Sequence, residues 1–354
     1  MTSRERLRTT LRRQEPDRMP LCEQSFWPET LARWQGEGMP PDTSPAELFE
    51  LDGFATFGLD CTLRLPEETL EETDEWVMDR DANGVVHKRW RNSYHTPAEV
   101  DWAIKTRADW ERHRERLTYA PERISDGVRQ AITEANAAEQ FCTIAPGEPV
   151  WWAISVLGME NAMLTLGADP NLFAEIMETV ATLALRMTRQ LLEEGYRPDG
   201  ILFSSDLCYR SGMLFSPATY RGMMLDYHRE YARLCHEHDM FLILHCDGDV
   251  RSFIPLLIEA EFDCIEPLEA RTGTDVRELK PLYGDRISFF GNISMDVLAA
   301  GDREAIRHEV VSKIEAAKPG GGYIHQSDHS VPPTVSWDAY RYWMDLAREH
   351  ADYG

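Results

Sequence analysis

The fold of this chain is decided by a short apolar run, FLILHCDGD at residues 241–249. The run has the length of a buried β-strand and stops at a glycine. Because side chains alternate between the two faces of a strand, His245 and Asp247 point to one side and Cys246 points to the other. A strand that ends with an imidazole beside a carboxylate is suited to binding or catalysis. A second polar segment of this kind, GGYIHQSDHSVPP, lies at residues 321–333.

Apolar runs of strand length recur along the chain, and helical stretches lie between most of them. Eight β-then-α units predict a closed parallel barrel, the (β/α)8 or TIM barrel, in a single domain over residues 1–354. An amphipathic helix over residues 3–13 precedes the first unit. The predicted strands are residues 19–22, 53–59, 141–145, 200–203, 241–244, 263–266, 287–290 and 322–324.

One segment interrupts this pattern after the second predicted strand. Residues 75–90 surround an Asn83-Gly84 pair, which is typical of a two-residue hairpin turn. We therefore predict a β-hairpin insertion at about residues 70–95 in the α/β barrel. The insertion is either a lid or docking flap for a partner, or a decoration that only packs against the barrel.

Composition narrows the class of protein. The 354 residues carry a net charge of −24 at pH 7, which disfavours nucleic acids and anionic membrane surfaces as partners. The seven cysteines are scattered without a CxxC pair, so reduced thiols in a cytoplasmic protein are the simplest interpretation. We find no signal peptide and no apolar stretch long enough to span a bilayer. A homodimer is compatible with this architecture, and the sequence leaves the oligomeric state open.

In a parallel barrel the active site lies at the C-terminal ends of the strands. His245, Asp247 and His329 fall at such ends and could form a two-His, one-carboxylate metal site with open positions. Zn²⁺ and Fe²⁺ both accept ligand sets of this kind. The alternative is a hydrogen-bonded His–Asp pair with His329 capping a loop, because H-x-D alone is a short and common pattern.

Other polar and aromatic side chains follow the predicted strand ends. The acids could exchange a proton or hold a polar group of a substrate, although Asp206 is equally suited to capping a helix. For the tryptophans, burial in the core is the default alternative to a pocket wall. The candidate catalytic acids are Asp60, Asp206 and Glu269. The candidate substrate contacts are Trp27, Trp151, Tyr209 and Asn292.

Four further motifs stand out: residues 4–20 at the first helix and strand, GEPVW at residues 147–151, LFSPATY at residues 214–220 and GNI at residues 291–293. As a set, these motifs and the residues above resemble the uroporphyrinogen decarboxylase superfamily over nearly the whole chain, especially its corrinoid-dependent methyltransferase branch. The resemblance implies a (β/α)8 barrel with its site at the strand C-termini.

Decarboxylases of this superfamily use an arginine-rich segment after the first strand. Here that segment begins with Glu23 and has no arginine before Arg33. Acidic residues at the barrel opening repel a polycarboxylate tetrapyrrole, which speaks against porphyrin decarboxylation. Asp60 nevertheless falls where the decarboxylases keep their central aspartate.

The methyltransferases of the superfamily hold Zn²⁺ with a His-x-Cys at the fifth strand and a Cys after the eighth. His245 matches the histidine, and Asp247 and His329 fall at the two cysteine positions. Oxygen and nitrogen replace both thiolates and remain competent ligands. Such a site suits a substrate oxygen better than a thiolate.

The resemblance therefore implies a metal-dependent methyltransferase or demethylase that takes a methyl group from a small O-methylated substrate. We expect a divalent metal, with Zn²⁺ as the first choice. The chain shows no Asp-x-His-x-x-Gly motif, so the cobalamin that accepts the methyl group would belong to a separate corrinoid protein. That protein would dock at the barrel mouth, against the hairpin at residues 75–90. The alternatives are a cofactor-free decarboxylase that uses Asp60, and a protein that binds a tetrapyrrole or small metabolite without turnover.

Overall fold

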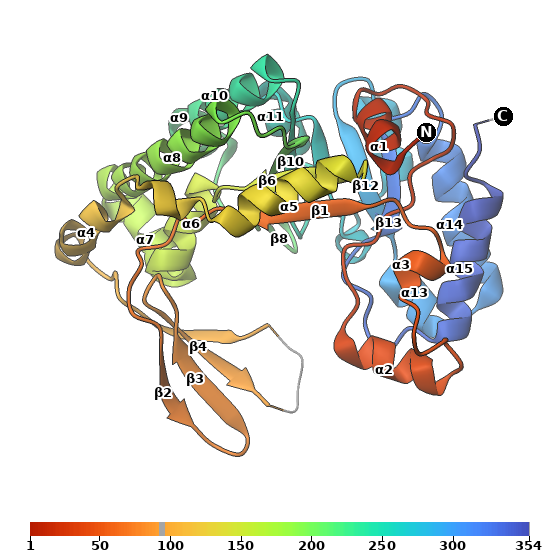
Figure 1. Cartoon of the computed structure of the whole chain (residues 1–354), viewed down its shortest axis with the longest axis horizontal. Coiled ribbons are helices and arrows are strands. Elements are labelled where there is room, and N and C mark those ends of the chain that lie inside the picture. The colour runs from red at the N-terminus through yellow and green to blue at the C-terminus, as the bar shows by residue number, and fades with distance from the viewer. Residues whose placement is uncertain (92–95, 354) are drawn as a thin grey trace. The chain divides into compact units, whose positions relative to one another are not determined.

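The computed structural model describes residues 1–91 and 96–353 and divides the chain into two compact units (Figure 1). The first unit comprises residues 1–57, 132–144 and 198–354, and the second comprises residues 58–131 and 145–197. Within the described ranges, none of the helices combines the length and the apolar character needed to cross a membrane.

The first unit is built on a seven-stranded sheet whose strands lie in the order β1-β6-β7-β10-β11-β12-β13. Neighbouring strands run parallel, for example β10 with β7 and with β11. Parallel strands are buried on both faces, which is why the sequence shows them as continuous apolar runs. The strands are β1 (Phe54–Gly58), β6 (Phe141–Ala145), β7 (Gly200–Ser204), β10 (Phe241–His245), β11 (Cys264–Glu266), β12 (Ser288–Ile293) and β13 (Tyr323–Ser327).

The predicted strand at residues 19–22 is present only as a bridged segment. Leu21 forms an isolated parallel bridge with His325 of β13, and the Cys22 N–H donates to the His325 carbonyl at 3.0 Å. The Leu21 carbonyl accepts from the Asp52 N–H at 2.6 Å, just before β1. Pro20 has no N–H to donate, which limits the ladder that this segment can form. The described part of the chain therefore has seven parallel strands where the sequence predicted eight.

Helices lie between most of the strands of the first unit, and the helical stretch that follows β9 (Gly212–Met213) is interrupted at Met224. The helices are α1 (Ser3–Leu11), α2 (Pro28–Gly36), α3 (Pro45–Leu48), α9 (Pro217–Met223), α10 (Leu225–Glu237), α11 (Ile254–Glu259), η3 (Ala270–Thr272), α12 (Val276–Tyr283), α13 (Met295–Ala300), α14 (Arg303–Ala317) and α15 (Trp337–Glu349). Two short strands, β8 (Cys208–Tyr209) and β9 (Gly212–Met213), pair antiparallel after β7.

Helix α1 packs into the interior of the first unit. Leu7 and Leu11 of this helix belong to the same buried cluster as Phe241 and Ile243 of β10. Burying each such side chain is worth roughly 1.5–3 kcal/mol. The remaining members of the cluster are Cys22, Phe141, Cys264, Phe290 and Ile324. The face of β10 that carries Phe241 and Ile243 is also the face on which His245 stands.

The second unit contains a four-stranded antiparallel sheet in the order β2-β3-β4-β5. The predicted hairpin lies within it, because β3 pairs with β4 across the Asn83-Gly84 turn, where Gly84 has φ +76°. The elements are β2 (Glu68–Glu72), β3 (Trp76–Arg80), β4 (Val85–Trp90), β5 (Ala98–Trp102), α4 (Arg107–His113), η1 (Arg114–Leu117), η2 (Pro121–Arg123), α6 (Pro149–Leu157), α7 (Met159–Ala168) and α8 (Pro170–Glu193). Helix α5 (Asp126–Ala137) contributes residues to both units.

A chain of hydrogen bonds fixes the buried imidazole of His325 in its neutral form. The indole N–H of Trp343 donates to His325 Nε2 at 2.8 Å, and His325 Nδ1 lies 3.1 Å from the Tyr323 hydroxyl. That hydroxyl donates to the Gly291 carbonyl at 3.1 Å, so Nδ1 carries the ring proton. Burial, together with the charge of Lys313, lowers the pKa of His325 to about 3.

We predict that His325 makes the protein less stable as the pH falls. Its pKa in the folded state is about 3 and its unfolded value is about 6.5, so unfolding takes up a proton between these limits. The unfolding free energy should therefore fall by up to about 1.4 kcal/mol per pH unit from this residue alone. Urea denaturation between pH 7 and pH 4 measures this slope.

The variant His325→Gln should show a shallower slope than the parent protein, even if it is less stable at pH 7. His308→Gln, on the exposed side of α14, is the matched control and should keep the parent slope. Equal slopes in the parent and His325→Gln would contradict the assignment.

Candidate functional site

His245 ends β10, and its ring is held by a buried carboxylate from the neighbouring strand. The parallel register places His245 opposite Glu266 of β11, and His245 Nδ1 lies 3.3 Å from Glu266 Oε2. Glu266 Oε1 accepts a hydrogen bond from Gln326 Nε2 of β13 at 2.9 Å. These contacts leave Nε2 of His245 facing Asp247, whose Oδ1 lies 4.0 Å away. A carboxylate behind an imidazole is the arrangement that orients metal-binding histidines.

Asp206 joins His245 and Asp247 in a compact cluster. One ligand atom from each of the three side chains lies within 4.8 Å of the other two. Asp206 follows β7, and its Oδ1 accepts a hydrogen bond from the Asp247 N–H at 3.0 Å. Oδ1 of Asp247 is buried and has no hydrogen-bond partner among the residues that the structure describes. A buried carboxylate oxygen without a partner is costly unless a cation occupies the site.

The electrostatics of the cluster favour a positive charge. Burial opposes protonation of His245, but the carboxylate of Glu266, followed by those of Asp247 and Asp206, raises its pKa to about 10. Burial, reinforced by the charge of Asp206, raises the pKa of Asp247 against the opposing effect of His245. A proton on the His245 ring therefore partly offsets the charge of the carboxylates.

His329 contacts this cluster from one side only. Its Nε2 lies 3.7 Å from Asp247 Oδ2, and 42% of its side chain is exposed to solvent. It does not belong to the group of ligand atoms that lie within 4.8 Å of one another in the described residues. In the structure, Asp206 rather than His329 completes the group with His245 and Asp247. The sequence had suggested Asp206 as a catalytic acid and His329 as the third metal ligand.

A cavity of about 690 Å³ lies beside Asp206 and Asp247. Tyr209, a predicted substrate contact, is one of its walls and is half exposed. Glu269 is another, but its Oε2 accepts the Gly248 N–H at 2.9 Å and its Oε1 pairs with Arg271 at 3.2 Å. The lining residues are Asp206, Cys208, Tyr209, Arg210, Asp247, Gly248, Glu269, Arg271, Thr272 and Asp296.

Gly248 brings the β8–β9 hairpin against the loop that carries Asp247. Its φ is +94°, and a Cβ at this position would lie 2.8 Å from the backbone N and O of Tyr209. The next residue, Asp249, donates its N–H to the Tyr209 carbonyl at 2.9 Å. Gly248, which follows the apolar run of β10, therefore allows the loop that carries Asp247 to approach the β8–β9 hairpin closely.

Asn292 has a different role from the predicted one. It is fully buried, its Oδ1 accepts the Val276 N–H at 2.8 Å, and its Nδ2 donates to the Leu268 and Thr274 carbonyls at 2.6 and 2.9 Å. Both amide protons are used by backbone carbonyls, so Asn292 holds loops in place rather than contacting a substrate. Trp27 is half-buried at the N-cap of α2 and does not line the cavity.

Two predicted site residues belong to the second unit. Burial opposes ionisation of Asp60, but hydrogen bonds from Thr62 and Arg64 and the charge of Arg123 outweigh it and lower its pKa. Asp60 Oδ1 accepts from the Thr62 hydroxyl at 2.6 Å, and its Oδ2 accepts from Arg64 Nε at 2.6 Å. Trp151 is half-buried in the first turn of α6, where its backbone N–H donates to the Glu148 carboxylate.

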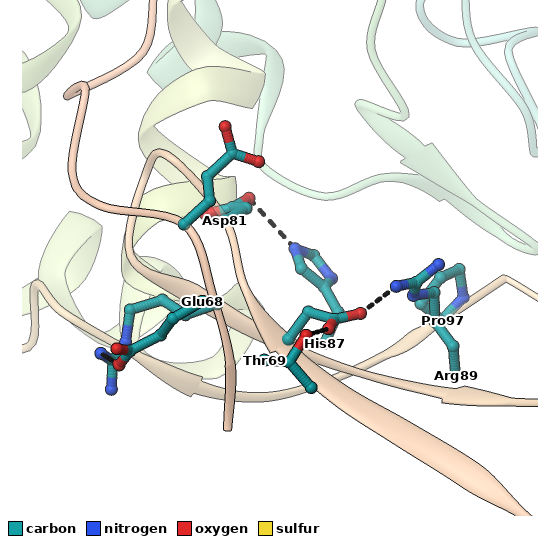
Figure 2. Close-up of a pocket in the computed structure, with 9 residues that line it drawn as sticks. Glu68, Thr69, Asp81, His87, Arg89 and Pro97 are labelled. Atoms are coloured by element: carbon teal, nitrogen blue, oxygen red, sulfur yellow. Dashed lines mark hydrogen bonds and ion pairs between the residues drawn. The ribbon is translucent and has the colours of Figure 1, made fainter. Parts of the chain in front are cut away.

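The second unit has a cavity of its own on the antiparallel sheet (Figure 2). Its volume is about 560 Å³, and its charged side chains are largely paired with one another. His87 Nε2 lies 3.1 Å from Asp81 Oδ2, and Arg89 pairs with Asp79 (Figure 2). A ligand here would have to displace these pairs, so the cavity of the first unit is the stronger candidate.

Two residues that orient His245 were not predicted from the sequence, and the negative charge of Glu23 was overstated. Glu266 and Gln326 orient His245, and the signal for Glu266 was available, since the apolar run at residues 263–266 ends in an acid. Burial raises the pKa of Glu23 to about 8 despite hydrogen bonds from Ser327, so it adds less negative charge at neutral pH than its type suggests.

Replacing Gly248 by alanine should loosen the β8–β9 hairpin from the loop that carries Asp247. The added Cβ would contact the Tyr209 backbone in a left-handed conformation, at an expected cost of ~1–3 kcal/mol in unfolding free energy. Urea denaturation measures the loss, and hydrogen exchange should rise selectively over residues 207–213. Gly301→Ala is the control, because it also has a positive φ but has no atom within 4 Å of the added Cβ. An equal rise in exchange over residues 207–213 in both variants would contradict the close approach.

Comparisons with known proteins agree with this architecture. The family model for uroporphyrinogen decarboxylase (URO-D) matches residues 103–350. A solved structure of a methyltransferase from Methanosarcina mazei superposes with a TM-score of 0.66 over 99% of both chains, at 15% sequence identity. At that identity the likeness shows a shared fold. No curated protein matches this chain in sequence. The match of the family model over more than half of the residues shows that the chain belongs to the uroporphyrinogen decarboxylase (URO-D) family.

Proposed function

We propose that this protein is a metal-dependent methyltransferase that removes a methyl group from a small O-methylated substrate and passes it to a corrinoid protein. Membership of the URO-D family and the fold shared with a methyltransferase from Methanosarcina mazei support this class of activity. Fold alone does not decide between chemistries, so the proposal depends on the site.

The observation that carries the proposal is the cluster of Asp206, His245 and Asp247. It brings together two carboxylates and an imidazole whose far nitrogen already has a carboxylate partner. Oδ1 of Asp247 is buried and has no hydrogen-bond partner among the described residues, and a cation bound to the cluster would satisfy it. Nitrogen and oxygen donors with open positions suit Zn²⁺ and other divalent first-row ions.

Each residue then has a defined task. Asp206, His245 and Asp247 would hold a divalent metal, which when bound supplies a Lewis acid for the ether oxygen of the substrate. Glu266 and Gln326 keep the His245 ring in the binding orientation. His329 lies 3.7 Å from Asp247 and is partly exposed, so we assign it the proton that the substrate oxygen takes up as the methyl group leaves.

The ligand set also favours an oxygen substrate over a thiol. Thiolate ligands share much of the charge of a metal ion, whereas carboxylates and imidazole are harder donors. In the proposed transfer, the C–O bond breaks, the oxygen keeps the electron pair and accepts a proton, and the methyl group goes to the reduced cobalt of the partner's corrinoid. The hairpin of β3 and β4 remains our candidate for the docking site of that partner.

Decarboxylation is not favoured by the surroundings of Asp60. Its two carboxylate oxygens accept hydrogen bonds from Thr62 and Arg64, and Arg123 Nη1 lies 3.5 Å from Oδ1. These contacts give Asp60 a role in holding its own loop, and they occupy both oxygens of the carboxylate.

Purified protein should bind one divalent metal per chain, and replacing a ligand should abolish binding. We expect His245→Ala and Asp247→Asn to lower metal affinity by more than about 100-fold, and Glu266→Gln by about 10- to 100-fold. Titration with Zn²⁺ followed by metal analysis after dialysis measures both. Asp249→Asn is the matched control, because that carboxylate lies on the same loop and pairs with Arg251. Equal metal content in all variants would remove the proposed site.

His329→Gln should separate proton transfer from metal binding. We expect the variant to keep its metal, because His329 lies outside the ligand cluster, and to lose about 100-fold in turnover. Formation of methylcobalamin from cob(I)alamin and a methyl ether, followed by absorbance, gives the rate. Loss of the metal in His329→Gln would instead make His329 a ligand.

A further inference from the structure

The cavity beside the cluster has one cationic side chain without a counter-ion. Arg271 pairs with Glu269 at 3.2 Å and lies 3.9 Å from Asp296, so its charge is balanced within the wall. Arg210 is exposed and lines the same cavity, but it forms no hydrogen bond or ion pair within residues 1–91 and 96–353. A guanidinium group that is free on a cavity wall is suited to bind a carboxylate with two parallel hydrogen bonds.

The backbone around Arg210 is held at a fixed position relative to the cluster. Arg210 follows Tyr209 in the turn of the β8–β9 hairpin. The hairpin is joined to the metal-binding loop by the hydrogen bond from the Asp249 N–H to the Tyr209 carbonyl, and by the close approach of Gly248. Asp206, which precedes the hairpin, accepts the N–H of Asp247. The guanidinium is therefore tethered at a limited range from the metal site.

The charge of the wall determines when an anion can enter. Four carboxylates and two guanidinium groups line the cavity, so it repels anions when it is empty. A divalent cation on Asp206 and Asp247 brings the wall to neutrality. An anionic substrate should then bind after the metal, with its carboxylate toward Arg210.

We propose that the substrate is a methoxy-carboxylate, whose ether oxygen reaches the metal while its carboxylate is bound by Arg210. This inference rests on the proposed function for the metal, and it adds the class of substrate. Neutral methyl ethers have no anionic group for Arg210 to bind, and the positive charge of methylated amines would be repelled by its guanidinium group.

The test uses methoxyacetate, 3-methoxypropanoate and 4-methoxybutanoate, each compared with the primary alcohol that has a CH2OH group in place of the carboxylate (2-methoxyethanol, 3-methoxypropan-1-ol and 4-methoxybutan-1-ol). Calorimetry measures their binding to the full-length protein with and without bound Zn²⁺. We expect at least one acid to bind about 10-fold more tightly than its alcohol, only with Zn²⁺ present. Arg210→Gln should remove this preference while keeping the metal, and Arg210→Lys should restore part of it.

Arg341→Gln is the matched control, because it removes one exposed guanidinium from α15 and should keep the preference. If Zn²⁺ binds but every acid binds no better than its alcohol, or if Arg210→Gln keeps the preference, the substrate class is wrong and the metal site stands. If the parent protein binds no metal, the proposed function fails first.

Discussion

The alternation of side chains along β10 is the constraint on which the rest of the site depends. Phe241 and Ile243 face the buried cluster that also holds Leu7 and Leu11 of α1. His245 continues the same row, and Asp247 follows it past the end of the strand. A shift of one residue in the register of β10 would send His245 to the opposite face, so the apolar core fixes the position of the imidazole.

The same strand brings like charges close together. Oxygen atoms of Asp206 and Asp247 lie within 4.8 Å of one another. The hydrogen bond from the Asp247 backbone N–H to Asp206 Oδ1 holds the two residues together. Two adjacent carboxylates in a partly buried site raise the free energy of the folded chain unless a cation lies between them. Against the effect of burial, the carboxylates of Glu266, Asp247 and Asp206 also raise the pKa of His245, so they favour a positive charge on its ring. This local cost is tolerated because strands on both sides of β10 hold the backbone in place.

How far the sequence predicted this arrangement depends on the kind of contact. The strands at residues 141–145 and 241–245 were predicted within one residue, because their apolar runs are bounded by polar residues. Strand 19–22 was predicted and is only a bridge, since Pro20 cannot donate to a ladder. His245 and Asp247 were paired by the two-residue period of a strand. Asp206 and His329 lie in loops after their strands, where no such period applies, and Asn292 lies inside β12 at φ +83°, so their positions around the site required the structure.

A family that includes decarboxylases raises the question of how this chain supplies positive charge to a substrate. Residues 23–32, which follow the first predicted strand, contain no arginine. In the cavity of the first unit, Arg271 is neutralised by its acidic neighbours. The acids of the cluster could instead hold the divalent ion that we propose. Such an ion carries twice the charge of a guanidinium group and can polarise a substrate oxygen directly. On our proposal, a cation bound by this ligand set, rather than an arginine segment, is the electrophile of the site.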